Sequence, residues 1–252
     1  MSEQSQMDMR AARDAAEPKL LHRLARKIAK TVYRAAGIAR ELRTNPYCES
    51  HHRMRCVYIH VPKTGGNAVT QMIYGLPSYS VGGHIPARTF LEYSPSLFAN
   101  YFVFATIRDP FERLRSTFHF LKAGGLSQGD RRWAKKNLAG LDTFRDFVTA
   151  LDSEKAETRL LGEVHLRPQS DYLCDASGRL IVNRLVKVEN FQREMRAVCE
   201  EIGATFSDAR LNVTVCDTGW RDHSDSDLKP VVRRLYAKDY EILNYDDSAA
   251  RF

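Results

Sequence analysis

Residues 58–69 read YIHVPKTGGNAV, and this stretch decides which kind of fold to expect. A short, mainly apolar run over residues 54–61 is typical of a buried strand. The turn PKTGG follows, and NAVTQMIYG then has the apolar spacing of a helix that stops at Gly75. A strand, a glycine turn and a helix in this order present backbone N–H groups to an anion, although an ordinary tight turn has the same pattern. The lysine precedes the glycines, whereas the ATP-binding loop G-x-x-x-x-G-K-[ST] places it after them.

A second unit of the same kind begins at the apolar run YFVFATI, residues 101–107. The sequence RDP then predicts a helix over FERLRSTFHFLK, with Pro110 in its first turn and a glycine pair at its end. Arg108 stands at the end of the strand, where its guanidinium would suit a phosphate, or would simply pair with Asp109. Ser116 stands about two turns into this helix, where serine is also an ordinary helix residue.

A third strand is expected within RLIVNRLVKVEN, residues 179–190, before a helix that ends at Gly203. The closing region, residues 225–245, predicts one further helix with Asp227 as its cap and Pro230 in its first turns. Strands that alternate with helices predict an α/β fold with a central parallel sheet flanked by helices on both faces. Ligands of such sheets bind at the carboxyl ends of the strands, so loops 62–67 and 108–110 should share one edge.

Basic residues are concentrated in one segment near the start of the chain. The 252 residues carry a net charge of +7, and residues 19–43 alone hold eight Lys and Arg against one Glu. Their spacing predicts a basic amphipathic helix that either docks on the domain or on a partner subunit, or lies on an anionic membrane surface. We expect an N-terminal extension over 1–50, with a linker at 44–50, and one domain over 51–252. A charge confined to one helix argues against nucleic-acid binding.

The rest of the composition points to a cytoplasmic protein. There is no apolar run long enough for a transmembrane helix and no stretch of signal-peptide type. The five cysteines are odd in number and form no C-x-x-C pair, so we expect reduced thiols and no zinc site. No other metal-ligand spacing is visible, and we expect no metal.

The two units together are far more specific than either alone. YIHVPKTGGNAV followed by FATIRDPFERLRSTFHF resembles the sulfotransferases that use 3′-phosphoadenosine-5′-phosphosulfate (PAPS), in particular the carbohydrate branch with heparan sulfate 2-O-sulfotransferases and bacterial relatives. HLRPQSDYL, VKVENFQREM and LYAKDYEILNY also look like stretches of that family, so the resemblance covers about residues 54–246. It implies a three-layer, P-loop-like fold. The chain departs from the pattern at Asn67-Ala68, where Thr-Ser is commoner, but the backbone donors remain.

The resemblance also implies how the cofactor is held. Lys63 would reach the oxygen that bridges phosphorus and sulfur, and the loop and helix N-terminus would hold the 5′-phosphate. Arg108 and Ser116 would bind the 3′-phosphate, which distinguishes PAPS and its product 3′,5′-ADP from ATP. The predicted cofactor-binding residues are Lys63, Thr64, Gly65, Gly66, Asn67, Ala68, Arg108 and Ser116.

A general base is expected within SVGGHIPARTFLEY, residues 80–93. His84 resembles in position the catalytic histidine of the 2-O-sulfotransferase branch, and histidine is the natural base near neutral pH. Taken alone, a loop histidine is more often a surface residue. Glu92 is the reserve candidate, because other branches use a glutamate. His60, inside the strand, is expected to pack or to orient the loop.

The sequence leaves the acceptor less well defined. We expect a glycan or glycolipid hydroxyl, and Arg88, His165, Arg167 and Gln169 are the candidate acceptor-binding residues, each of which is otherwise a polar loop residue. A nucleotide-dependent kinase of related fold is the alternative, but it needs a lysine after the glycines and a metal-binding acid. A non-catalytic surface-binding protein would leave both phosphate motifs unexplained. Membrane contact through residues 19–43 and an oligomer are left open.

Overall fold

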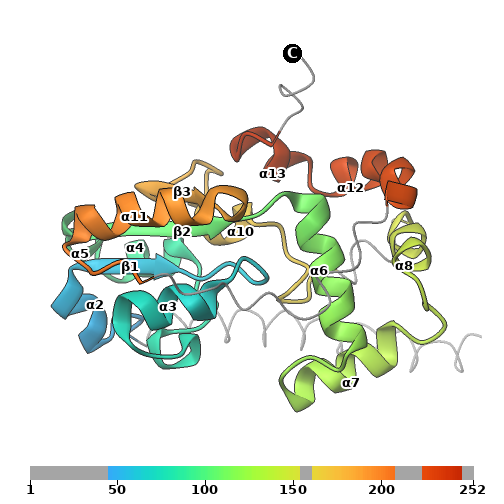
Figure 1. The fold of residues 1–252 in the computed structure, drawn as a ribbon, viewed down its shortest axis with the longest axis horizontal. Helices are drawn as coiled ribbons and strands as arrows, with labels where there is room; N and C mark the ends of the chain where they lie inside the picture. The colour runs from blue at the N-terminus through green and yellow to red at the C-terminus, as the bar shows by residue number, and fades with distance from the viewer. Residues whose placement is uncertain (1–44, 154–160, 208–222, 246–252) are drawn as a thin grey trace, which may run out of the picture. The chain divides into compact units, whose positions relative to one another are not determined.

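The computed structural model describes residues 45–153, 161–207 and 223–245, and Pro46–Phe252 forms one compact unit (Figure 1). The basic helix expected over 19–43 lies outside the described residues. Residues 46–50, expected in a linker, belong to the compact unit instead. The reason is Tyr47, which is 5% exposed and donates a hydrogen bond to the carbonyl of Phe90 at 3.1 Å. Helix α2, Glu49–Met54, follows at once.

Three parallel strands form the sheet, as predicted, in the order β1-β2-β3. They are β1 Cys56–Ile59, β2 Phe102–Ile107 and β3 Arg184–Lys187. The first and third are shorter than the apolar runs that predicted them. Arg55 takes a left-handed conformation, with φ 46°, where α2 ends, and the chain turns into a 3₁₀ helix, Val188–Asn190, directly after β3.

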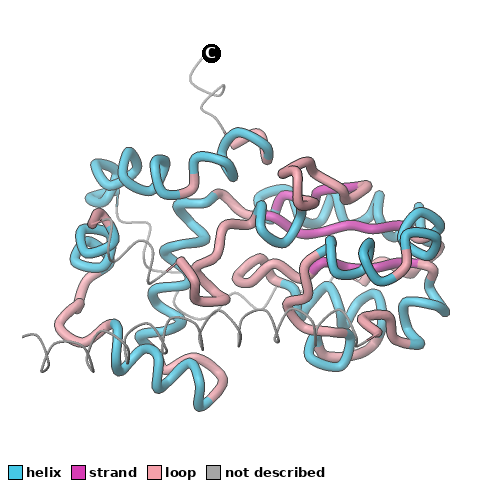
Figure 2. Tube along the Cα trace, turned by 180° about the vertical axis from the view of Figure 1, so that it is seen from behind, coloured by secondary structure: helices cyan, strands magenta, loops and turns pink. Residues whose placement is uncertain are grey.

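Helices cover both faces of this sheet, which confirms the expected layers (Figures 1 and 2). One face carries α3, Gly66–Tyr74, and α11, Phe191–Ile202, whose apolar side chains pack on Tyr58 and Phe104. The other face presents Val57 and Val103. The helices that pack on it are α4 Ala87–Tyr93, α5 Pro95–Asn100 and α10 Ser170–Leu173. A 3₁₀ helix, Ser78–Val81, links α3 to the α4 side.

A third apolar cluster, beyond the two on the faces of the sheet, is built almost entirely from helices. Helix α6, Pro110–Lys122, leads from β2 into this cluster, and its residues Phe111, Leu114, Phe118 and Leu121 are buried there. The other helices are α7 Gln128–Asn137, α8 Phe144–Leu151, α12 Lys229–Leu235 and α13 Ala237–Ile242. None of the described helices is long and apolar enough to cross a membrane.

The prediction of a single closing helix was wrong. Residues 225–245 form the end of a 3₁₀ helix, His223–Leu228, and then α12 and α13, which are separated at Tyr236. Pro230 does lie in the first turn of α12. Asp227 caps nothing, because its carboxylate accepts hydrogen bonds from Arg145 of α8 at 2.7 and 2.8 Å.

Candidate active site

The two predicted loops meet at the carboxyl edge of the sheet, as expected from the parallel order of β1 and β2. Thr64 joins them: its Oγ1 donates to the carbonyl of Val61 at 2.8 Å and lies 2.7 Å from Oγ1 of Thr106 in β2. Both threonines are fully buried. The loop after β1 is therefore fixed to the end of the neighbouring strand.

The turn that precedes α3 has the geometry of an anion site. Lys63 and Gly65 both have positive φ, 69° and 81°, which reverses the chain sharply before the helix begins at Gly66. No side chain caps this N-terminus. The N–H of Ala68 donates to the carbonyl of Gly65 at 3.1 Å, but the helix offers no such carbonyl to the N–H groups of Gly66 and Asn67, which precede it. These N–H groups and the positive end of the helix dipole favour a bound anion.

Residue 66 is a glycine where the ring of His60 packs too closely to leave room for a side chain. A Cβ built on Gly66 would lie 2.0 Å from Cδ2 and Nε2 of the His60 ring, so a side chain there forces the ring to move. The His60 ring stacks on Tyr58 at 5.8 Å and is 8% exposed. The structure thus agrees with the expectation that His60 packs and orients the loop.

Three histidines from distant parts of the chain lie side by side next to this turn. The ring centroid of His84 is 4.3 Å from that of His60 and 5.8 Å from that of His165. His60 is 8% exposed, and the side chain of His165 is 12% exposed, so these two rings are largely buried. The glycine-rich turn around His84 thus returns this residue to the end of β1, although 24 residues separate it from His60.

His84 is oriented by the backbone. Its Nδ1 lies 2.9 Å from the carbonyl oxygen of His60, which can only accept, so Nδ1 carries the proton and Nε2 carries the lone pair. Burial lowers the pKa of His84, although the His60 carbonyl and Asp130 oppose this. Burial, followed by the positive charge of neighbouring groups, lowers the pKa of His60 to about 3 and that of His165 to about 4. All three rings are therefore neutral at pH 7.

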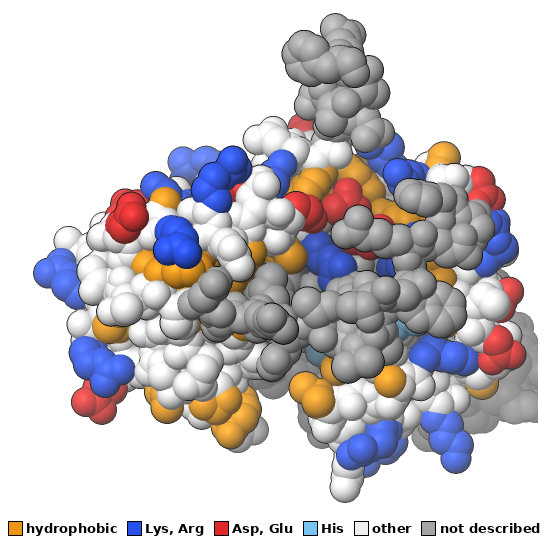
Figure 3. Space-filling model, in the orientation of Figure 1, with side chains coloured by type: hydrophobic (Ala, Val, Ile, Leu, Met, Phe, Trp, Pro, Cys, Tyr) orange, Lys and Arg blue, Asp and Glu red, His pale blue; other side chains and the backbone are white. Residues whose placement is uncertain are grey.

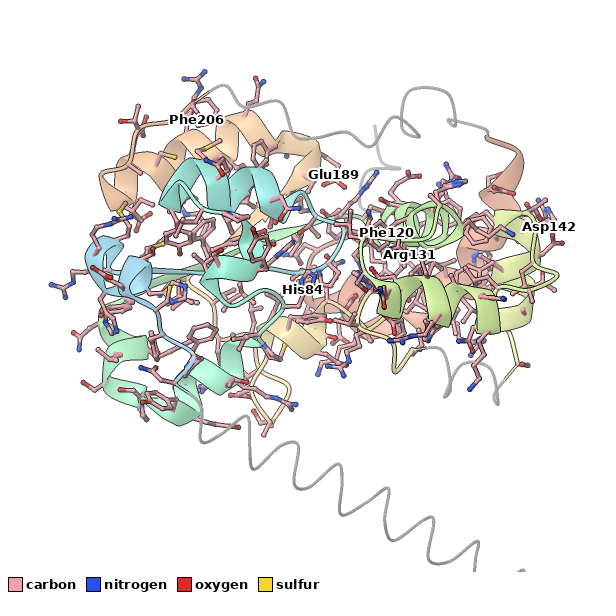
Figure 4. All side chains as sticks on the ribbon, turned by 90° about the horizontal axis from the view of Figure 1, so that it is seen from below. His84, Phe120, Arg131, Asp142, Glu189 and Phe206 are labelled. Atoms are coloured by element: carbon pink, nitrogen blue, oxygen red, sulfur yellow. The ribbon has the colours of Figure 1, made fainter. Side chains whose placement is uncertain are left out.

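Helix α6 closes the other side of the site. Nζ of Lys63 lies 4.1 Å from the ring centroid of Phe120, and the Phe120 ring is 4.9 Å from that of His165. Ser116 precedes Phe120 by one helical turn on the same face of α6. Figure 4 shows His84 and Phe120 near one another, with Asp142 and Phe206 far from them on opposite sides. The structure thus brings four predicted residues to one region, namely Lys63, His84, Ser116 and His165.

The backbone of Arg108 is held by a side chain from a distant segment. The amide of Gln169 accepts from the N–H of Arg108 at 3.1 Å and donates to its carbonyl at 2.7 Å. Gln169 is fully buried, and its own N–H and that of Ser170 donate to Asp239 at 2.7 and 2.8 Å. Gln169 is a predicted acceptor-binding residue, but its hydrogen bonds position Arg108.

Glu189 fixes the next residue of the same turn. Its Oε1 accepts from the N–H of Asp109 at 2.9 Å, and its Oε2 accepts from the hydroxyl of Tyr245 at 2.8 Å. The Asp109 carboxylate accepts from the N–H of Glu112 at 3.0 Å and caps α6. The N-terminus of α6 is thus occupied by a carboxylate, whereas the N-terminus of α3 has no cap.

Arg113 holds the segment that carries His165. This arginine is 1% exposed, and its guanidinium donates to the carbonyls of His165 at 3.2 Å and Arg167 at 2.6 Å. Sequence reasoning gave no role to Arg113, Glu189 or Asp239. Each of them stands inside a stretch that carries the family resemblance, and this was the only signal that could have singled them out.

Other predicted site residues lie further out. Arg88 and Glu92 are exposed on α4, and Arg167 is exposed in the loop before α10. Asn67 is exposed at the start of α3, where its Oδ1 accepts from Ser78 at 2.7 Å. Among the described residues, no hydrogen bond, ion pair or ring contact joins these side chains to His60, His84 or His165.

A cavity of about 410 Å³ lies between the end of α6 and α7. Its walls include Lys122, Arg131 and Lys135 beside apolar side chains. Figure 3 shows Lys and Arg side chains gathered over α7, whose sequence is QGDRRWAKKN. This cavity is suited to a ligand that carries negative charge.

These features define an α/β protein in which a turn suited to an anion lies beside largely buried histidines. Residues 49–246 match the family model described as the Sulfotransferase family, and the chain belongs to that family. It is therefore a transferase of sulfuryl groups. A comparison with curated proteins found no match, and a comparison with solved structures found none either.

Proposed function

We propose that this protein transfers the sulfuryl group of PAPS to a hydroxyl of a glycan or glycolipid, with Lys63 and His84 as its catalytic residues. The observation that carries this proposal is the uncapped N-terminus of α3, which begins at Gly66, three residues after Lys63. Gly66 packs on the ring of His60, which lies 4.3 Å from the ring of His84. The order of strand, tight turn and helix also supports the P-loop-like description of the fold.

The residues of both loops fit the two phosphate groups of PAPS. The 5′-phosphosulfate would bind the N–H groups of residues 64–68. The His60 ring packs so closely on Gly66 that residue 66 has no room for a side chain, which leaves the turn open to the phosphosulfate. The 3′-phosphate would bind Arg108 and Ser116. Because Asp109 already caps α6, side chains rather than helix N–H groups must supply the positive charge there.

Lys63 is the proposed electrophilic residue. PAPS supplies the sulfuryl group, and negative charge grows on the bridging oxygen as this group leaves. A lysine ammonium in a site sheltered from water stabilises such charge by a few kcal/mol. The ring of Phe120, whose centroid is 4.1 Å from Nζ, attracts the ammonium group and limits the directions in which Lys63 points. The transfer itself then requires no metal.

His84 is the proposed general base. Its Nδ1–H donates to the His60 carbonyl, so Nε2 is the atom that accepts the proton of the acceptor hydroxyl. The lowered pKa keeps His84 neutral and ready to accept this proton at pH 7. The fixed carbonyl also stabilises the imidazolium that forms. Glu92, exposed on α4, has less support as the base.

The acceptor would enter from the side of α4 and α7. Arg88, His165 and Arg167 remain the proposed contacts, whereas for Gln169 we propose that it positions Arg108. The cavity beside Lys122, Arg131 and Lys135 favours an acceptor with negative charge. A kinase has less support, because the lysine stands before the glycines.

We further propose that residues 1–45 form an extension to the domain, which begins at Pro46 rather than at residue 51. We also propose that the protein is cytoplasmic and that residues 19–43 contact the inner surface of the membrane. The eight basic residues of that segment support this membrane contact. Flotation with anionic vesicles tests it, since equal recovery of chains with and without residues 1–45 would remove it.

His84→Ala tests the central assignment. It should lose transfer of label from radiolabelled PAPS to a panel of glycans by at least about a hundredfold, the usual contribution of a general base, while binding 3′,5′-ADP normally. His52→Ala is the matched control, because His52 is exposed on α2 and contacts Tyr101 instead. Near-normal transfer by His84→Ala would disprove the base assignment, and loss of 3′,5′-ADP binding would assign His84 to the cofactor site instead.

A further inference from the structure

Three potential metal ligands that are far apart in the sequence come together beside the proposed active site. Asp130 stands in the first turn of α7, whereas Glu163 and His165 belong to the segment before α10. One carboxylate oxygen of each acid and one nitrogen of the imidazole all lie within 4.8 Å of one another. Their separation in the chain is the reason why no ligand spacing was visible in the sequence.

The two hydrogen-bonding sides of the Asp130 carboxylate have different functions. Oδ2 accepts from the N–H groups of Leu126 and Ser127 at 3.0 and 2.9 Å, which fixes the carboxylate at the start of α7. Oδ1 points instead to Nε2 of His165 at 3.6 Å. This distance is too long for a hydrogen bond, but it is close to the separation of two ligands of one metal ion.

The ring of His165 is largely buried, with 12% of the side chain exposed. Because Nε2 is the nitrogen that faces Asp130, it is the nitrogen available to an ion shared with the two acids. The buried Nδ1, which has no hydrogen-bond partner among the described residues, lies on the opposite side of the ring. Arg113 holds the carbonyl of the same residue, so the ring is fixed in place.

The two acids also lie close together, because one carboxylate oxygen of Asp130 and one of Glu163 are within 4.8 Å of each other. A bound cation would relieve the repulsion between two carboxylates at this separation.

We propose that Asp130, Glu163 and His165 bind a divalent transition-metal ion. One imidazole nitrogen and two carboxylates suit Mn²⁺ or Zn²⁺, and three protein ligands leave coordination positions open to water or to an acceptor oxygen. The ion would join the start of α7 to the segment that carries His165, and so complete one wall of the site next to Phe120. This proposal does not rest on the identity of the transferred group.

Mn²⁺ is the better probe, because cysteine thiolates compete for Zn²⁺ but not for Mn²⁺. The full chain without nucleotide is titrated with Mn²⁺, and free Mn²⁺ is measured by electron paramagnetic resonance. We expect one site per chain and a dissociation constant at least tenfold higher for Glu163→Gln, which keeps the size of the side chain. Asp142→Asn is the matched control: this acid is 86% exposed and pairs with Lys122.

Thermal unfolding of each variant without metal shows whether it folds. Mn²⁺ should raise the unfolding temperature of the wild-type chain and of Asp142→Asn, but not that of Glu163→Gln. If Glu163→Gln does not fold, Asp130→Asn replaces it, because asparagine keeps an oxygen for the N–H groups of Leu126 and Ser127. No binding at millimolar Mn²⁺, or equal binding by the wild type and a folded ligand variant, would overturn the proposal.

Discussion

Replacement of His51 by asparagine is expected to remove part of the acid sensitivity of the fold. His51 is fully buried in α2, and burial lowers its pKa from 6.5 to about 4. The unfolded chain therefore binds a proton below pH 6.5 that the folded chain binds only near pH 4. Stability is retained above pH 6.5 and is lost as the pH falls between these values.

The magnitude follows from the two pKa values. Between pH 8 and pH 5, titration of His51 lowers the free energy of unfolding by about 2 kcal/mol. Near pH 4 and below, this decrease approaches about 3 kcal/mol. Asparagine does not titrate, and its side-chain oxygen can replace Nδ1, which accepts from the N–H of Cys48 at 3.1 Å. His51→Asn should thus lower stability at pH 8 but lose about 2 kcal/mol less than the wild type on acidification to pH 5.

Urea unfolding at a series of pH values measures this difference directly. His52→Asn is the matched control, since His52 is the next residue of the same helix but is exposed. The control should keep the acid sensitivity of the wild type. If His51→Asn and His52→Asn lose stability equally between pH 8 and pH 5, then burial of His51 is not what makes the fold sensitive to acid.

Two substitutions at the cofactor loops give further predictions. Gly66→Ala forces the His60 ring to move and should lower the free energy of unfolding by about 1–3 kcal/mol; an unchanged urea midpoint contradicts the packing described. Gln169→Ala removes both hydrogen bonds to the backbone of Arg108, each of which is worth about 1 kcal/mol. By calorimetry, 3′,5′-ADP should bind about tenfold more weakly and 5′-AMP almost normally. An equal loss for both nucleotides would mean that Gln169 supports the whole site rather than the 3′-phosphate.

The sequence predicts the parts of the fold that depend on short-range patterns. Apolar runs located all three strands, and glycines marked the ends of α3 and α11, where Gly75 and Gly203 have positive φ. Pro110 marked the start of α6. The order of strands and helices was enough to infer that both loops share an edge, because parallel strands end on the same side.

The sequence could not predict features that depend on contacts between distant residues. Asp227 has the pattern of a helix cap, but the guanidinium of Arg145, 82 residues away in the chain, binds it instead. Similarly, the side chain of Gln169 forms hydrogen bonds with Arg108, 61 residues away in the chain. The sequence around Gln169 has the pattern of a loop and therefore did not indicate that this side chain is buried. Nothing local distinguishes a side chain that binds a ligand from one that binds a backbone.

The most direct test of the account compares the binding of three nucleotides to the wild-type chain by calorimetry and thermal unfolding. We expect 3′,5′-ADP to bind more tightly than 5′-AMP and than ATP with Mg²⁺, because Arg108 and Ser116 add contacts to the 3′-phosphate. At a hundred times its dissociation constant, 3′,5′-ADP should add about 2.7 kcal/mol of stability. Arg108→Ala should remove this preference. Tighter binding of ATP with Mg²⁺, or no binding of any of the three, would contradict the assignment of both loops to PAPS.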